Sequence, residues 1–139
     1  MNGVVDSQGR ALMTVPIRNI PDGTAIPVSV WLDTGFTGDL VLPKSQIEQL
    51  GLSVSSIVQT ILADGREAKV ESYVAWLDWF GELQEVEVCA SSGRNILLGV
   101  RLMLGRRLVV DYETLELTLD RLSPDRPDAR GRGLRGSGG

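Results

Sequence analysis

The chain has 139 residues, 42% of them apolar, and carries 14 Lys and Arg against 18 Asp and Glu, with one cysteine and no histidine. This length suits a single domain, and the missing histidine excludes the usual neutral-pH base, the Ser-His and Cys-His nucleophile pairs and the commonest metal ligand. The net charge of −4 argues against nucleic acid as the main partner, and a lone cysteine allows neither an intramolecular disulfide nor a CxxC metal site.

The distribution of apolar residues argues against a membrane span and a signal peptide. No apolar run approaches the length of a membrane span, and no signal-peptide pattern follows Met1. We therefore expect no membrane span and a cytoplasmic location. Cys89 is expected to be a buried strand residue, because no imidazole is available to ionise its thiol.

The first half of the chain predicts strands and one short helix. Apolar residues alternate with less apolar ones over residues 11–17 and again over residues 26–32, with turn residues 19–23 between them. Residues 44–50 predict a helix that Pro43 opens and Gly51 closes.

The second half predicts more strands. Residues 57–63 and 67–79 flank Asp64-Gly65, a dipeptide suited to a tight hairpin, and residues 83–90 continue as a strand. A last hairpin is expected over residues 108–112 and 115–119, after a short helix at 100–104. The chain thus predicts an all-β fold with one or two short helices and no βαβ rhythm.

Three segments follow from this pattern. Residues 1–10 are expected to be an N-terminal lead, residues 11–119 the domain, and residues 120–139 a disordered tail rich in arginine and glycine. An alternative for the tail is an arm that contacts an acidic partner.

An acid follows an apolar strand directly where residues 30–32 lead into Asp33-Thr34-Gly35. A carboxylate at the end of a buried strand is costly unless it is hydrogen-bonded or functional. The tripeptide fits two interpretations. In one, its side chains satisfy backbone donors in a turn; in the other, Asp33 is a catalytic acid.

A second motif, Leu97-Leu98-Gly99, stands before the helix expected at residues 100–104. Together with Leu32-Asp33-Thr34-Gly35 and the hairpin at Ala63-Asp64-Gly65, it resembles the retropepsin-like aspartic proteases, which include the retroviral proteases and the half-size relatives of pepsin. The order and spacing of these motifs cover residues 11–119. The resemblance implies a closed β-barrel, with one lobe of the acid-protease fold in each chain.

The activity implied by this resemblance is that of an aspartic endopeptidase with no metal and no other cofactor. In such enzymes two carboxylates share one proton, so that one activates water while the other acts as an acid toward the peptide carbonyl. The sequence contains one Asp-Thr-Gly. The pair therefore requires Asp33 from each of two subunits of a symmetric homodimer, with a peptide or protein as substrate.

The same resemblance gives roles to further residues. Thr34 would brace the two catalytic loops across the dimer axis, Gly35 would admit the substrate backbone, and Leu97-Leu98-Gly99 would pack beneath the loop. Substrate would be contacted by Trp31, Thr37, Ala63, Asp64, Gly65, Asn95 and Leu97. Plain core packing is the open alternative for Trp31 and Leu97.

The sequence departs from the family pattern in three respects, which concern an ion pair, the residue after Asp-Thr-Gly and the hairpin tip. Retroviral proteases carry an acid two residues after the motif glycine and an arginine directly after the later glycine, and the two form an ion pair. Thr37 and Val100 occupy these positions, so that ion pair is not expected here. Phe36 replaces the usual small residue after Asp-Thr-Gly, and the Asp-Gly hairpin tip differs from the glycine-rich retroviral one.

Two other functions share features with this sequence. A phosphotransfer enzyme of the haloacid dehalogenase type needs a second Asp where Gly35 stands, together with a parallel α/β fold. The stronger alternative is a catalytically silent dimeric module of the same fold, which binds extended peptide or mediates assembly. Trp76, Trp79 and Phe80 would then mark a partner surface unless they belong to the core. The hairpin at residues 108–119 is expected at the subunit interface, because edge strands need covering.

Overall fold

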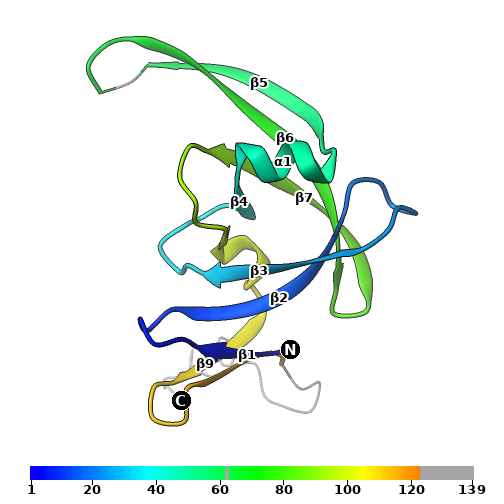
Figure 1. Cartoon of the computed structure of the whole chain (residues 1–139), viewed down its shortest axis with the longest axis vertical. Coiled ribbons are helices and arrows are strands. Elements are labelled where there is room, and N and C mark those ends of the chain that lie inside the picture. The colour runs from blue at the N-terminus through cyan, green and yellow to red at the C-terminus, as the bar shows by residue number, and fades with distance from the viewer. Residues whose placement is uncertain (62, 123–139) are drawn as a thin grey trace, which may run out of the picture.

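The computed structural model describes residues 1–61 and 63–122. Its elements are β1 (Asn2–Val5), β2 (Ala11–Arg18), β3 (Ile26–Leu32), β4 (Leu40–Pro43), α1 (Lys44–Leu50), β5 (Ser53–Ile61), β6 (Glu67–Trp79), β7 (Glu82–Ser91), β8 (Leu97–Leu98), the 3-10 helix η1 (Val100–Leu102), β9 (Arg106–Asp111) and β10 (Glu116–Arg121). Figure 1 shows them along the chain. Among the described residues, no helix is long and apolar enough to cross a membrane.

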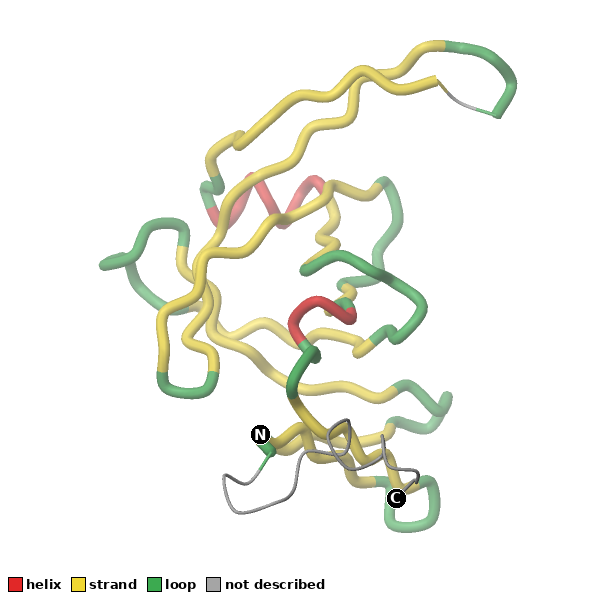
Figure 2. Tube along the Cα trace, turned by 180° about the vertical axis from the view of Figure 1, so that it is seen from behind, coloured by secondary structure: helices red, strands yellow, loops and turns green. Residues whose placement is uncertain are grey.

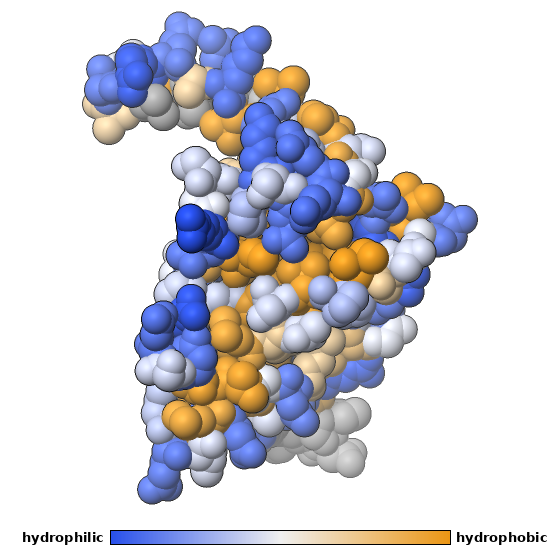
Figure 3. All heavy atoms as spheres, in the orientation of Figure 1, coloured by the Kyte–Doolittle hydropathy of each residue, from blue (hydrophilic) through white to orange (hydrophobic). Residues whose placement is uncertain are grey.

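The strands form one sheet that closes on itself. Their order is β5-β6-β7-β4-β8-β3-β2-β1-β10-β9, and a further pairing of β6 with β2 closes a ring of six strands. The outer part of the β5–β6 hairpin, where residues 57–61 pair with residues 67–71, projects from this ring as an arm (Figures 1, 2 and 3). Strands β1, β10 and β9 continue the sheet beyond β2. The all-β closed barrel predicted from the sequence is confirmed.

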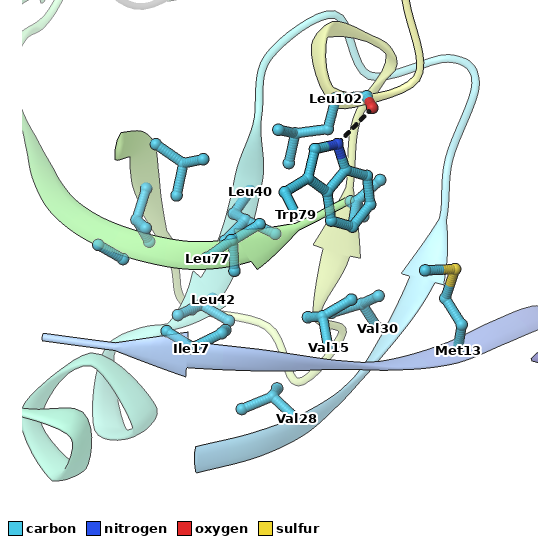
Figure 4. Close-up of a cluster of buried hydrophobic side chains, with 14 of the residues drawn as sticks. Met13, Val15, Ile17, Val28, Val30, Leu40, Leu42, Leu77, Trp79 and Leu102 are labelled. Atoms are coloured by element: carbon cyan, nitrogen blue, oxygen red, sulfur yellow. Dashed lines mark hydrogen bonds between the residues drawn. The ribbon is translucent and has the colours of Figure 1, made fainter. Parts of the chain in front are cut away.

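Alternate side chains of the strands fill the ring. Met13, Val15 and Ile17 of β2 point inward with the apolar residues of β3, β4 and β6, as Figure 4 shows. Trp79 belongs to this core, and its indole Nε1 donates a hydrogen bond of 3.2 Å to the Leu102 carbonyl of η1. Because Trp79 is only 2% exposed, it cannot mark a partner surface; Trp76 is half-buried.

The structure differs from the predicted segments at both ends of the domain. Residues 2–5, expected in the lead, form strand β1, which pairs with both β2 and β10. Four residues are too few to show an alternating pattern, so the sequence alone does not predict this strand. Asp120 and Arg121, expected in the tail, extend β10 opposite Arg107 and Arg106, and the predicted tail from residue 123 lies outside the described residues.

Several boundaries also shift. Strand β5 begins at Ser53 rather than at residue 57, with a register shift between Val54 and Ser56, because backbone pairing to β6 extends through serines that break the apolar pattern. The helix expected at residues 100–104 is one 3-10 turn. Strand β9 begins at Arg106 and is the last strand in the described sheet, where it pairs with β10; its place in a subunit interface stays a prediction.

Three surface carboxylates predict how stability responds to acid. Backbone donation from Arg10 lowers the pKa of Asp6, the Arg18 guanidinium lowers the pKa of Asp78, and the backbone amides of Thr114 and Glu113 lower the pKa of Asp111. A lowered folded-state pKa gives stability above the unfolded-state value that disappears as the pH falls through the folded-state value. We expect the Tm, followed by circular dichroism, to fall below about pH 4. A Tm that rises on acidification would contradict this.

Candidate active site

The predicted catalytic acid lies where the chain leaves the sheet. Strand β3 ends at Leu32, and the chain returns as β4 after a loop of residues 33–39. Strand β8 lies between β3 and β4, parallel to the first and antiparallel to the second. The Asp33 amide donates to the Leu98 carbonyl at 2.9 Å. A backbone hydrogen bond therefore joins the Asp-Thr-Gly motif to the Leu97-Leu98-Gly99 motif, although the two are far apart in the sequence.

The Asp33 side chain caps its own turn. Its Oδ1 accepts a hydrogen bond of 2.8 Å from the Gly35 amide, and its carbonyl accepts one of 3.1 Å from the Phe36 amide. Asp33 is half-buried, and Thr34 and Gly35 are exposed. Among the described residues, no hydrogen bond is formed to Asp33 Oδ2.

Gly99 is required by close packing beneath this loop. A Cβ atom at this buried residue would lie 2.1 Å from the Gly38 carbonyl oxygen and 2.6 Å from Cδ2 of Phe36. The Gly99 amide donates to the Asp39 carbonyl, and the Val100 amide donates to the Phe36 carbonyl, both at 2.8 Å. Phe36 thus occupies the space over Gly99, which accounts for the large residue after Asp-Thr-Gly.

An ion pair joins the same two segments, although none was expected at Thr37 and Val100. Asp39 Oδ1 lies 3.6 Å from Nε of Arg101, and Asp39 Oδ2 accepts a hydrogen bond of 2.9 Å from the Glu87 amide. The sequence analysis missed both residues of this pair, because they stand further from their glycines than in the retroviral pattern. An acid directly before the apolar strand β4 was the available signal.

Loss of the Asp39 carboxylate should destabilise the loop. Its side chain is 10% exposed, so Asp39→Ala removes a buried acceptor and leaves the Glu87 amide unpaired, at a cost of about 2 kcal/mol in the free energy of unfolding. Arg101→Ala should cost less than about 1 kcal/mol, because that side chain is 59% exposed. Urea unfolding of the two variants measures the difference; equal losses would show that the amide contact contributes little.

Trp31 and Asn95 line a common pocket. It has a volume of about 180 Å³, and Arg10 and Arg94 also line it. Trp31 is half-buried and is paired in register with Leu97. The Trp31 side chain is therefore partly packed against its neighbours and partly exposed in the pocket. The half-buried Leu97 does not line this pocket.

The remaining predicted contact residues lie in two places, the turn between β5 and β6 and the loop that holds Asp33. The hairpin turn holds Ala63, Asp64 and Gly65, where Gly65 has a φ of 85° and Asp64 pairs with Arg66 at 2.6 Å. The turn stands at the end of the projecting β5–β6 hairpin, away from the end of β3 (Figure 1). Thr37 is exposed, and it forms no side-chain hydrogen bond within the described part of the chain. The turn therefore stands away from the catalytic candidate, whereas Thr37 shares the loop of residues 33–39 with Asp33.

Two further kinds of chemical group bear on the described ranges, clustered metal ligands and the thiol of Cys89. They contain no group of three or more His, Cys, Asp or Glu side chains that could hold a metal ion. Cys89 is half-buried rather than buried, and desolvation followed by the charges of Glu87 and Asp39 raises the pKa of its thiol. A raised pKa disfavours the nucleophilic thiolate.

The comparisons with known proteins bear on the fold. No protein-family model and no curated protein matches the sequence. EIAV protease complexed with the inhibitor HBY-793 is 20% identical, with a TM-score of 0.50 over 75% of this chain and 96% of that chain. The retroviral protease-like domain of Ddi1 from Leishmania major is 15% identical, with a TM-score of 0.45 over 80% and 90% of the two chains. With the closed ring and the loop braced by Leu98 and Gly99, the chain has an all-β, retropepsin-like fold.

Proposed function

We propose that this protein is an aspartic endopeptidase that hydrolyses peptide bonds in extended polypeptide segments. The observation that carries the proposal is the placement of Asp33. Its carboxyl group stands at a strand end in a loop that the Leu98 carbonyl and Gly99 hold from below, with one oxygen fixed by the Gly35 amide. A fixed carboxyl orientation is what a general acid or base requires.

The chemistry requires a second carboxyl group. Two carboxylates that share one proton give a base that takes a proton from water and an acid that donates one to the carbonyl oxygen. One chain supplies a single Asp33. The second acid would therefore be Asp33 of another copy of the chain, related to the first by a twofold axis. Thr34 and Gly35, exposed beside it, would lie at that axis and beside the substrate backbone.

The β5–β6 hairpin would cover the substrate. Its outer part projects from the ring as a two-stranded arm, in which residues 57–61 and 67–71 pair only with each other among the described strands (Figure 1). Such an arm can move relative to the body. Closure of such an arm over an extended peptide would bring its turn to the site and exclude water.

A silent binding module of the same fold is the second candidate. It is favoured by the Asp33 Oδ1 bond to Gly35, because a turn-capping role gives the acid a structural value without catalysis. Such a module would form the same dimer and bind the same extended segments, without cleaving them.

Incubation with a mixed peptide library distinguishes the two functions. The protein should generate new peptide termini, read by mass spectrometry, and Asp33→Asn should generate none. Equal cleavage by both proteins would overturn the proposal, because the products would then come from a contaminating protease. Peptide binding without cleavage by either folded protein would establish the module.

A further inference from the structure

The pocket that Trp31 of β3 and Asn95 line is positively charged, although the chain has a net negative charge. Residues 1–122 carry 10 Lys and Arg against 16 Asp and Glu, yet the lining of this pocket includes two arginines and no acid. Its lining residues are Arg10, Leu12, Ser29, Trp31, Arg94, Asn95 and Ile96. The charge therefore differs from that of the body around it.

Arg10 is held in place at the wall of the pocket. Its Nε donates to Asp6 Oδ2 at 2.7 Å, and its guanidinium carbon lies 5.8 Å from the centroid of the Trp31 ring. Hydrogen bonds from Arg10 and Gln8 lower the pKa of Asp6, so Asp6 stays ionised and balances the charge of Arg10. The other guanidinium nitrogens of Arg10 remain as oriented hydrogen-bond donors.

Arg94 supplies the surplus charge. It is exposed, and within the described ranges it forms no ion pair with an acid. Asn95 and Ser29 add an amide and a hydroxyl to the lining. An aromatic wall, an unpaired guanidinium and neutral donors together suit a carboxylate, which arginine binds through two parallel hydrogen bonds.

We propose that this pocket binds an acidic side chain of the peptide, so that the protein selects substrates with Glu or Asp near the scissile bond. The inference rests on the proposed function, which places the peptide along Asp33. Trp31 stands two residues before Asp33, a spacing of about 7 Å along a strand. An acidic residue one or two positions from the cleaved bond would then reach Arg94.

Binding to the inactive protein tests the pocket without requiring cleavage. Fluorescein-labelled peptides of alanine and leucine, with Glu, Gln or Lys at one scanned position, would be titrated into Asp33→Asn protein and followed by anisotropy. At the best position the Glu peptide should bind about fivefold more tightly than the Gln peptide, and high salt should reduce the ratio. Equal affinities of the Glu and Gln peptides at every position would overturn the inference.

Charge reversal at Arg94 provides the second arm. Arg94→Glu, placed in the same inactive protein, should abolish the preference for Glu and favour Lys. Lys44→Glu is the matched control, since Lys44 is exposed at the start of α1 and lies outside this pocket. The control should keep the preference for Glu. Equal shifts in both variants would mean a general charge effect and would contradict a specific pocket.

The two hypotheses fail in different ways. If the unsubstituted protein cleaves no peptide while the Glu preference depends on Arg94, the protease proposal is wrong and the pocket is correct. If it cleaves peptides with no preference for acidic residues and Arg94→Glu changes neither kcat nor KM, the pocket is wrong and the protease proposal is correct.

Discussion

Asp33→Asn should lower kcat/KM for peptide hydrolysis by about 10³-fold or more while leaving the fold unchanged. The asparagine carbonyl oxygen can still accept the bond from the Gly35 amide, which is 2.8 Å in the native chain, so the turn keeps its cap. What disappears is the ionisable group that takes the proton from water. Initial rates on a fluorogenic peptide, with circular dichroism and sedimentation on the same samples, measure both effects.

Asp22→Asn is the matched control for this substitution. Asp22 is exposed in the turn between β2 and β3, so the same loss of charge there should leave kcat/KM unchanged. Loss of activity in Asp33→Asn that is accompanied by unfolding would point to a structural role. Retained activity in a folded Asp33→Asn protein would rule out Asp33 as the catalytic acid.

Gly99→Ala should destabilise the protein by about 3 kcal/mol and lower its Tm by about 10 °C. The added methyl would lie 2.1 Å from the Gly38 carbonyl oxygen, which belongs to backbone and cannot rotate away, and 2.6 Å from the Phe36 ring. The loop of residues 33–39 must move to relieve this contact, so the proposed activity should fall even at temperatures where the variant is folded. Thermal unfolding and activity at low temperature test the two effects.

Gly93→Ala provides the comparison for Gly99→Ala. Its Cβ would meet only the Ser91 Oγ at 3.3 Å, an exposed side-chain atom that accepts a hydrogen bond from the Gly93 amide and can shift by a few tenths of an ångström. The free energy of unfolding should therefore change by less than about 0.5 kcal/mol. Similar losses in the two variants would show that the cost comes from replacing glycine in general. A stable Gly99→Ala protein would show that the loop is not held against Gly99 as described.

The strand pattern could be predicted wherever the residues alternate. Strands β2 and β3 carry apolar residues at every second position, and the structure buries those residues except Ile26, which is exposed at the start of β3. Strand β1 and the start of β5 lack this signal: one is four residues long and the other begins in serines. Both are strands because a neighbour offers free backbone groups, and such pairing is not visible in the local sequence.

The site shows the same division between local and long-range information. Asp33, Leu98 and Gly99 were found because their motifs are compact, and their contact follows from the position of β8 between β3 and β4. The Asp39 and Arg101 pair was missed, since it depends on how two distant loops approach each other. Arg94 was missed for a similar reason: its charge matters only because the fold places it beside Trp31.

Mixed dimers test most directly whether one Asp33 from each of two subunits forms the catalytic pair. Native and Asp33→Asn chains would be unfolded together at varied ratios, refolded, and assayed at constant total protein. If both acids are needed, activity should follow the square of the native fraction, so an equal mixture retains about one quarter of the native activity. Activity that falls in direct proportion to the native fraction would contradict a shared site.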